Sequence, residues 1–382
     1  MRAIAVILIL CLLTCLLPVS AMAEEVTIKS IDPSPYYDSQ PRVYGNHVTW
    51  RRAINQNANE YIELNEPSWI MAHNLETGKT WNVTPANKVM GGTVFYHAQS
   101  PDISGDRIVY EAQTGLNSSD TKLFLYNISQ KKTWELPIRS TSKAQGHLHC
   151  MSGNWVAYTN YHNGSRQAYL YNYQDGIYRT ILGINDGNTT YGMVMSKDYV
   201  VITMKNESNV FSILAYNIGS GHKEMITDDL SRIMLATTTS GKNIGIISKN
   251  FNGTEWSTRI YRIGTGFTKS YDSKGILIWG DSVAISNGDY ISFLSSDSYE
   301  WAVINGQNQR LGDIYKNNIV WSDNENSEAL HGDARDNYDI YIRTVITDKE
   351  IFIEWMWLVL VIVAIIIALV ILRIKVYSAN ER

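Results

Sequence analysis

The sequence predicts an all-β protein, a β-propeller, followed by one transmembrane helix near the C-terminus. Three observations lead to this prediction. Tyr, Trp, Val, Ile and Thr are frequent between residues 26 and 349, turn residues occur at short intervals, and no long stretch has helical periodicity. Two short motifs recur along this region. An uncharged apolar run then occupies residues 355–372.

The first recurring motif is a tight turn followed by a strand that ends in a large residue. Gly105-Asp106-Arg107-Ile108-Val109-Tyr110 is a sharp copy, and others begin at Gly45 and Gly153. The Gly-Asp or Gly-Asn pair supplies the turn, and the β-branched residues supply a buried strand. Weaker copies begin at Lys197, Lys242, Gly280 and Lys316. We expect the recurring large residues Trp50, Tyr110, Tyr158 and Trp321 to pack in the core between blades.

The second motif follows most copies of the first, as in Leu125-Tyr126-Asn127-Ile128. A turn such as Glu76-Thr77-Gly78-Lys79 comes next, and a short strand such as Thr80-Trp81-Asn82-Val83 closes the unit. The pattern gives about four strands per repeat of roughly 36 to 60 residues, which is typical of propeller blades. Seven copies of the first motif predict seven blades. A β-sandwich array would not need this period, and a β-solenoid would use shorter, more regular coils.

The two ends of the repeat region predict how the ring closes. The last copy has no obvious closing strand of its own, whereas residues 26–43 precede the first copy. Pairing the N-terminal segment with the last blade would remove the open edge between the first and last blades. We therefore expect an N-terminal strand in the last blade.

Residues 1–23 have the pattern of an export signal. Arg2 is followed by an apolar run up to Pro18, and Ala21-Met22-Ala23 forms a small-residue cleavage site. The alternative is a retained N-terminal anchor helix, but small residues end the apolar run. The signal predicts that residues 24–349 form an extracellular domain.

Residues 350–372 are predicted to span a membrane once. The run from Trp355 to Leu372 carries no charge and is about long enough to cross a bilayer core at about 1.5 Å per residue. Arg373, Lys375 and Arg382 follow the span, and acidic residues precede it. The positive-inside rule then places residues 373–382 as a short cytoplasmic tail of a single-pass cell-membrane protein.

The composition fits an exported domain. Only Cys150 remains after the signal, so no disulfide can form within the chain, and the net charge of −4 comes with no basic cluster outside the tail. Nucleic-acid binding is therefore not expected. Asn-x-Ser/Thr triplets predict glycosylation. The candidate asparagines are Asn117, Asn163, Asn188, Asn206 and Asn252.

The sequence offers few residues for metal chemistry. The segment His147-Leu148-His149-Cys150 has ligand-type side chains, but no second pair has metal-site spacing, so a polar linker beside one buried thiol is the simpler interpretation. An acidic stretch in the last copy could bind Ca²⁺, although its spacing differs from the EF-hand loop. Its candidates are Asp323, Glu325, Asp333 and Asp336, and a solvated loop is the alternative.

No catalytic residue, cofactor site or enzyme motif is predicted. The chain lacks a G-x-S-x-G elbow, an H-E-x-x-H helix and a phosphate-binding loop. Because a triad can assemble from distant positions, an enzyme stays open as an alternative. Aromatic residues outside the repeats, Tyr36, Tyr37, Trp69 and Tyr96, are candidates for a ligand-binding face, with incidental packing as the alternative.

The repeats resemble the TolB-type, WD-repeat-like propellers of prokaryotic surface proteins. The segment Pro101-Asp102-Ile103-Ser104-Gly105-Asp106-Arg107-Ile108-Val109-Tyr110 is similar to the family's Gly-Asp-x-Ile-Val-Trp strand, and Asp339-Ile340-Tyr341 is similar to its Asp-Ile-Tyr element. The similarity is greatest to surface proteins of methanogenic archaea. It implies a binding or scaffold propeller outside the cell and no catalytic residues.

Three functions follow from this sequence. The first is a non-catalytic surface module that binds a protein or glycan ligand on its loop face or helps to build the envelope. The second is an exported hydrolase or lyase, which would need carboxylates or histidines clustered at the mouth of the central channel. The third is a receptor that acts through a membrane partner, because the tail is short. The fold alone does not select among them.

Overall fold

The computed structural model divides the chain into two units. One comprises Ile28–Thr344, and the other comprises the two terminal segments Met1–Thr27 and Val345–Arg382. The structure describes residues 29–32, 36–53, 68–84, 89–90, 93–94, 97–113, 121–137, 148–162, 165–183, 188–226, 231–250, 256–287, 290–294, 302–305, 309–316, 318–323, 339–344, 360–362 and 364–371.

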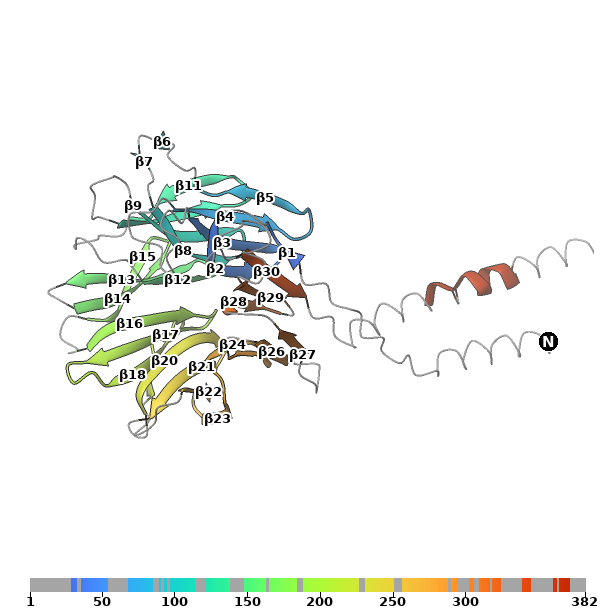
Figure 1. Ribbon diagram of the computed structural model, residues 1–382. Helices are drawn as coiled ribbons and strands as arrows, with labels where there is room; N and C mark the ends of the chain where they lie inside the picture. The colour runs from blue at the N-terminus through green and yellow to red at the C-terminus, as the bar shows by residue number, and fades with distance from the viewer. Residues whose placement is uncertain are drawn as a thin grey trace, which may run out of the picture. The chain divides into compact units, whose positions relative to one another are not determined.

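The larger unit is built from antiparallel groups of four strands (Figure 1). Among the described residues these form five four-stranded sheets and one eight-stranded sheet, which joins two such groups through a single parallel bridge between Ser68 and His97. The first two groups are β2(Tyr37–Tyr44), β3(His47–Ala53), β4(Ser68–Asn74) and β5(Lys79–Asn82), then β8(His97–Ser104), β9(Arg107–Gln113), β10(Thr121–Asn127) and β11(Lys132–Glu135). Strands β6(Val89–Met90) and β7(Thr93–Val94) form a separate hairpin.

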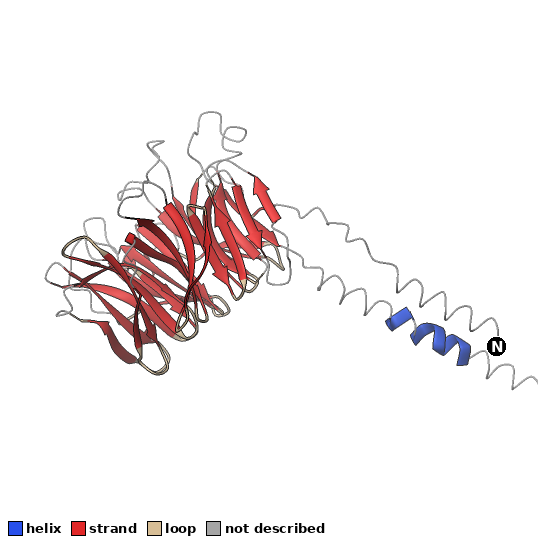
Figure 2. Ribbon diagram, turned by 90° about the horizontal axis from the view of Figure 1, so that it is seen from below, coloured by secondary structure: helices blue, strands red, loops and turns tan. Residues whose placement is uncertain are grey.

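Four more groups follow in chain order, each pairing its strands consecutively. They are β12(His149–Ser152), β13(Trp155–His162), β14(Ser165–Asn172) and β15(Ile177–Leu182); β16(Asn188–Met195), β17(Tyr199–Asn206), β18(Phe211–Asn217) and β19(Lys223–Ile226); β20(Ser231–Ser240), β21(Asn243–Asn250), β22(Trp256–Arg262) and β23(Gly266–Tyr271); and β24(Gly275–Trp279), β25(Ser282–Ser286), β26(Tyr290–Leu294) and β27(Ala302–Asn305). Figure 2 shows the groups side by side, with many tight turns along one edge.

The last group combines both ends of the unit. Strands β28(Arg310–Tyr315), β29(Asn318–Asp323) and β30(Asp339–Thr344) are joined by the N-terminal strand β1(Lys29–Ser30). Lys29 pairs with Ile342 and Ser30 with Tyr341, and the Ile31 amide donates to the Ile340 carbonyl at 2.9 Å. The expected N-terminal strand in the last blade is therefore confirmed, and it covers the outer edge of β30.

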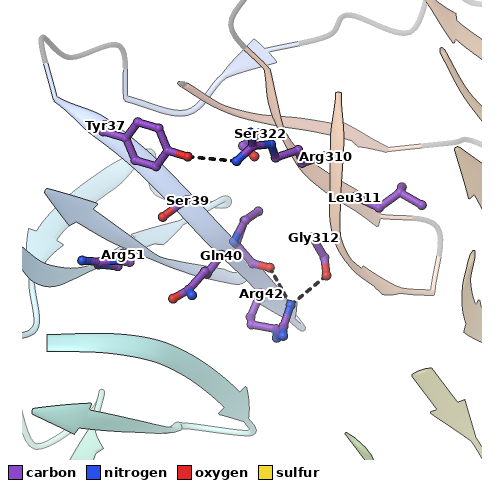
Figure 3. Close-up of a pocket in the computed structure, with 10 residues that line it drawn as sticks. Tyr37, Ser39, Gln40, Arg42, Arg51, Arg310, Leu311, Gly312 and Ser322 are labelled. Carbon is purple, nitrogen blue, oxygen red and sulfur yellow. Dashed lines mark hydrogen bonds between the residues drawn. The ribbon is translucent and has the colours of Figure 1, made fainter. Parts of the chain in front are cut away.

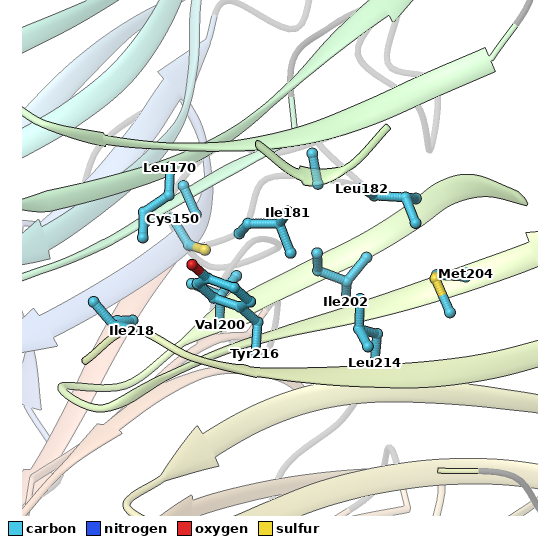
Figure 4. Close-up of a cluster of buried hydrophobic side chains, with 12 residues drawn as sticks. Cys150, Leu170, Ile181, Leu182, Val200, Ile202, Met204, Leu214, Tyr216 and Ile218 are labelled. Atoms are coloured by element: carbon cyan, nitrogen blue, oxygen red, sulfur yellow. The ribbon is translucent and has the colours of Figure 1, made fainter. Parts of the chain in front are cut away.

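The first strands of the groups contact one another in a closed circle. Along the chain β2 contacts β8, and the contacts continue through β12, β16, β20 and β24 to β28, which contacts β2. Hydrophobic clusters fill the space between neighbouring groups. One of them joins Cys150 and Leu170 of the third group to Val200, Ile202 and Tyr216 of the fourth (Figure 4). Burying these side chains from water holds adjacent sheets face to face.

The two sequence motifs correspond to the strands and turns that they predicted. Gly45 and Gly105 adopt φ values of 57° and 62°, and Tyr44 pairs with His47 across the two-residue turn. Glycine at the first turn position is typical of a type II′ hairpin. The large residues that end the first motif lie within the second strands and are core residues, as expected. Trp50, Tyr110, Tyr158 and Trp321 are all buried.

The recurring asparagine of the second motif caps the next turn. The Oδ1 atom of Asn127 accepts a hydrogen bond from the Gln130 amide at 2.8 Å, and that of Asn217 accepts one from Ser220 at 2.8 Å. Asn74 and Asn172 do the same for Thr77 and Asp175. An asparagine that bonds to the following backbone stabilises a turn locally, which explains its recurrence at the end of the third strand.

The smaller unit contains a helix over residues 360–362 and 364–371. These residues are all apolar, and Leu369 is 62% exposed. Within the described part of the chain, no helix has both the length and the apolar character needed to cross a bilayer. The rest of the predicted span 350–372, the signal 1–23 and the tail 373–382 lie outside the described residues.

Candidate functional site

A pocket of about 430 Å³ lies between the first and last groups of strands. Its walls come from β2 and β28, with one residue each from β3 and β29 (Figure 3). Residues 40 and 310 are therefore brought together only because the first and last groups of the larger unit meet. The lining residues are Tyr37, Ser39, Gln40, Pro41, Arg42, Arg51, Arg310, Leu311, Gly312 and Ser322.

Close backbone packing forms the floor of the pocket. A Cβ atom on Gly312 would lie 2.3 Å from Cγ of Pro41 and 2.8 Å from its carbonyl oxygen. Both distances are shorter than real Cβ contacts, so only glycine lets β28 approach β2 this closely. On the other side, the β2 ladder shifts register between Ser39 and Arg42, and Gln40 has a φ of 55°. This bulge directs β2 side chains toward the pocket.

Arg42 is held by groups on its own strand and on two neighbouring strands. Its Nη1 atom donates to the Gly312 carbonyl at 2.8 Å and to the Pro41 carbonyl at 3.3 Å, and its Nε lies 3.8 Å from Oδ1 of Asp102 (Figure 3). Asp102 lies on β8 and Gly312 on β28. Arg42 therefore links the first group to both of its neighbours.

Two carboxylates beside Arg42 bond to backbone amides of adjacent groups. Oδ2 of Asp313 accepts from the Val43 amide at 3.1 Å, and Oδ2 of Asp102 accepts from the Met151 amide at 2.7 Å. Burial raises the pKa of Asp313 to about 6 and also raises that of Asp102, although nearby Arg42 opposes both shifts. The Asp313 carboxylate therefore connects β28 to β2, and the Asp102 carboxylate connects β8 to β12.

Arg310 and Arg51 line the pocket from two different strands, β28 and β3. The Arg310 Nη1 donates to the Tyr37 hydroxyl at 3.0 Å, which orients the guanidinium (Figure 3). Arg310 is exposed, and Arg51 is partly buried. The pocket lining thus contains three arginines and no aspartate, glutamate or histidine. Such a surface favours anions, because guanidinium groups bind carboxylate, sulfate and phosphate oxygens in paired hydrogen bonds.

A buried ion-pair cluster lies on β2 and β3. Arg52 bonds to Asp38 and to Asp32, which follows β1. Burial raises the pKa of Asp38 to about 7, with Arg52 acting in the opposite direction. Asp323 is also buried, opposite Asp339 on β30, and its Oδ2 accepts from Gln309 Nε2 at 3.1 Å.

The proposed calcium residues are only partly described. Asp323 is buried at the end of β29, while Glu325, Asp333 and Asp336 lie outside the described residues. Over the described ranges, no group of three or more His, Cys, Asp or Glu side chains is arranged to bind a metal ion. Cys150 is buried, as the sequence indicated, and burial raises the pKa of its thiol. His149 bonds through Nε2 to the Ser100 carbonyl at 2.6 Å.

Two of the five candidate glycosylation asparagines lie within the residues that the structure describes. Asn206 is exposed at the end of β17, and Asn188 is partly buried at the start of β16. Asn117, Asn163 and Asn252 lie outside the described residues.

Of the aromatic candidates, Tyr37 lines the pocket, whereas Tyr36 packs edge-on against Trp69, with ring centroids 5.3 Å apart. Tyr96 is outside the described residues. The sequence did not single out the three arginines. One signal was present: Pro41-Arg42-Val43 occupies the place that Pro101-Asp102-Ile103 occupies in the second copy, so an arginine replaces an aspartate at a repeat position.

No protein-family model matches the sequence, and no curated protein matches it. Solved structures do match. The β-propeller domain of the Trilobed protease from Pyrococcus furiosus is similar over 81% of this chain and 95% of that chain, with a TM-score of 0.57 and 12% identity. An acylaminoacyl peptidase in complex with Z-Gly-Gly-Phe-chloromethyl ketone matches 84% of this chain, with a TM-score of 0.53 and 10% identity.

These similarities define the class of protein as a β-propeller, which confirms the fold class expected from the repeats. TolB from Acinetobacter baumannii also matches, over 64% of this chain at 13% identity, but its TM-score of 0.43 supports no conclusion. The chain spans 54% of the acylaminoacyl peptidase and 57% of TolB. At these identities the comparisons show the fold alone.

Proposed function

We propose that the protein is a membrane-anchored, seven-bladed propeller on the cell surface that acts as a non-catalytic binding or envelope scaffold module for a protein or glycan ligand. The observation that carries the proposal is the arginine-lined pocket between β2 and β28. The pocket lining combines three arginines with hydroxyl and amide groups, a set that suits holding an anionic ligand.

The blade number is supported by the circle of first strands. Strands β2, β8, β12, β16, β20, β24 and β28 each begin a four-stranded group, and each contacts the next. The β1 strand completes the last group from the other end of the chain. A ring closed in this way is rigid and can present loops and a pocket to a ligand.

The membrane anchor is supported by the apolar run 355–372 and by the exposed side chains of its described helical part. Ile365, Ile367 and Leu369 are each more than half exposed, which is costly in water and favourable in lipid. Seven Asn-x-Ser/Thr triplets in residues 24–349 support an extracellular location for the propeller.

A fractionation experiment tests the anchor. The full-length protein, tagged at the C-terminus, is expected to stay in the membrane pellet after alkaline carbonate washing. Protease added to intact cells is expected to remove the propeller and spare the tag. The double variant Ile365→Arg with Leu369→Arg should release protein into the soluble fraction, because each central arginine costs about 2.5–3.5 kcal/mol on insertion. The control Ile365→Leu with Leu369→Ile should remain in the pellet.

A second experiment separates binding from catalysis. Full-length protein in detergent is applied to arrays of glycans and envelope proteins, and the captured ligands are analysed for cleavage by mass spectrometry. Retention of an intact ligand supports the proposal. Cleavage of the ligand by wild-type protein would instead establish the hydrolase or lyase alternative. Recovery of the chain in cytosol with residues 1–23 still attached would contradict the surface location.

A further inference from the structure

We propose that the pocket between β2 and β28 binds the carboxylate of an acidic sugar, with Arg51 and Arg310 holding the anion. This inference deepens the binding function proposed above and rests on it. It assigns one site and one ligand class to a surface for which the fold specifies neither.

The charge of the lining selects an anion. Three arginines line the cavity, and no Asp or Glu belongs to its described lining. The nearby acidic groups are already bonded within the protein. Asp38 pairs with Arg52, and Asp102 and Asp313 accept backbone amides from neighbouring strands. A ligand carboxylate would therefore meet positive charge on the pocket surface, with the protein's own negative charges turned toward other partners.

The three arginines have different tasks. Arg42 is bound to two carbonyl oxygens and lies 3.8 Å from Asp102, so its charge is compensated and its position fixed. Arg310 is exposed and is oriented by the Tyr37 hydroxyl, and Arg51 reaches the cavity from β3. A guanidinium oriented in advance loses less entropy when it binds a planar carboxylate. Arg310 and Arg51 are therefore the residues that recognise the ligand. Arg42 has a structural role, because it connects β2 to β28 and β8.

The other lining groups favour a ligand rich in hydroxyls. Ser39 and Ser322 bring hydroxyl groups, Gln40 brings an amide, and Tyr37 brings a phenol. Pro41, Leu311 and the Tyr37 ring add apolar surface that is about as extensive as the polar surface. The cavity of about 430 Å³ falls in the usual range for small-ligand sites, about 300–1,000 Å³. A uronic acid, with one carboxylate and several hydroxyls, fits this set of groups.

The position of the pocket predicts a second effect of binding. Its walls come from the first and last groups of strands, which meet only through ring closure. A ligand that contacts Arg51 on one side and Arg310 on the other would bridge the two groups. Because such a ligand binds the closed ring and not the unfolded chain, it should stabilise the protein against unfolding.

Calorimetric titration of the full-length protein in detergent tests the proposal, with sodium glucuronate, glucose and sodium sulfate as probes. Wild-type protein should bind glucuronate, and glucose should bind at least about tenfold more weakly. Arg51→Gln and Arg310→Gln should each weaken glucuronate binding by about tenfold or more, and higher salt should weaken it in wild type. The control Arg262→Gln changes an exposed arginine on β22 and should bind like wild type.

Three results would overturn the inference: no glucuronate binding by wild-type protein, equal binding by the Arg51→Gln/Arg310→Gln double variant, or sulfate binding as tightly as glucuronate. Thermal unfolding of each variant without ligand verifies that the fold is retained, and saturating glucuronate should raise the wild-type melting temperature. If glucuronate fails but an intact neutral glycan or protein is retained on the arrays, this inference falls while the binding function stands. If ligands are cleaved, the proposed function itself falls.

Discussion

Arg52 donates two hydrogen bonds to Asp38, from Nε to Oδ1 at 2.8 Å and from Nη2 to Oδ2 at 2.6 Å. Both side chains are buried. The same guanidinium donates from Nη1 to Asp32 at 2.9 Å. Asp32 follows β1, the outer strand of the last group, and Asp38 lies on β2, the first strand of the first group. One arginine therefore fixes the segment that passes between the two ends of the ring.

Removal of Arg52 should destabilise the protein strongly. In Arg52→Met the buried Asp38 loses its partner, and at pH 8, above the folded pKa of Asp38, breaking the buried pair from one side costs about 3–5 kcal/mol. Urea unfolding monitored by tryptophan fluorescence measures this loss. Lys122→Ala is the matched control, because its bridge to Glu135 is exposed on both sides and should contribute less than about 1 kcal/mol. Equal losses in the two variants would contradict the role given to Arg52.

The pKa of Asp38 predicts a pH dependence of stability. Burial raises this pKa from 3.8 to about 7 in the folded state, so the folded protein holds the proton over a range where the unfolded chain has released it. The stabilising contribution of Asp38 to the free energy of unfolding is therefore greatest below about pH 4, and it is lost as the pH rises through about 7. The loss is on the order of a few kcal/mol.

Asp38→Asn isolates this effect, because asparagine does not titrate. Its unfolding free energy, measured by urea titration at pH values between 4 and 8, should fall less steeply with pH than that of wild type. Asp313, with a folded pKa of about 6, contributes a remaining slope in the same direction in both proteins. A wild-type stability that rises over this range would show that Asp38 is ionised throughout.

Gly312 should not tolerate a side chain. The Cβ atom of Gly312→Ala would overlap Pro41, including its backbone, so β28 must move away from β2. Overpacking of this kind costs about 1–3 kcal/mol, and the pocket should lose its ligand affinity as well. Gly275→Ala is the control, since its Cβ would lie 3.3 Å from the flexible end of Leu311 and at ordinary contact distances of 3.8 and 3.9 Å from Ser286. Thermal unfolding of both variants measures the difference.

The N-terminal strand should protect the last group. Ile31→Pro removes the amide that bonds to Ile340, and it should loosen the pairing of β1 with β30. Hydrogen exchange followed by mass spectrometry should then show faster exchange in residues 339–344. Ile31→Val keeps the amide and should leave exchange there close to wild type. Unchanged exchange in Ile31→Pro would mean that β1 contributes nothing to closing the ring.

Much of the propeller could be predicted from the sequence, because its signals are local. A Gly-Asn or Gly-Asp pair favours a two-residue turn, alternation sets which side chains are buried, and Asn127 caps a turn three residues away. The lack of a closing strand in the last copy also indicated that the N-terminal segment would supply it. These features depend on neighbours in sequence, or on a count of strands.

The pocket could not be predicted in the same way. Arg42 donates to the carbonyl of Gly312, 270 positions away, and Arg310 bonds to Tyr37 across a similar separation. Strand periodicity assigns each side chain to a face of a sheet, but it does not say which side chain of a distant strand lies opposite. Ring closure makes that choice, because burying the apolar faces of the first and last groups against each other also brings their polar residues together. The sequence by itself determined the repeating strands, their turns and the need for a closing strand. Only the tertiary structure decided that three arginines from separate strands would share one cavity.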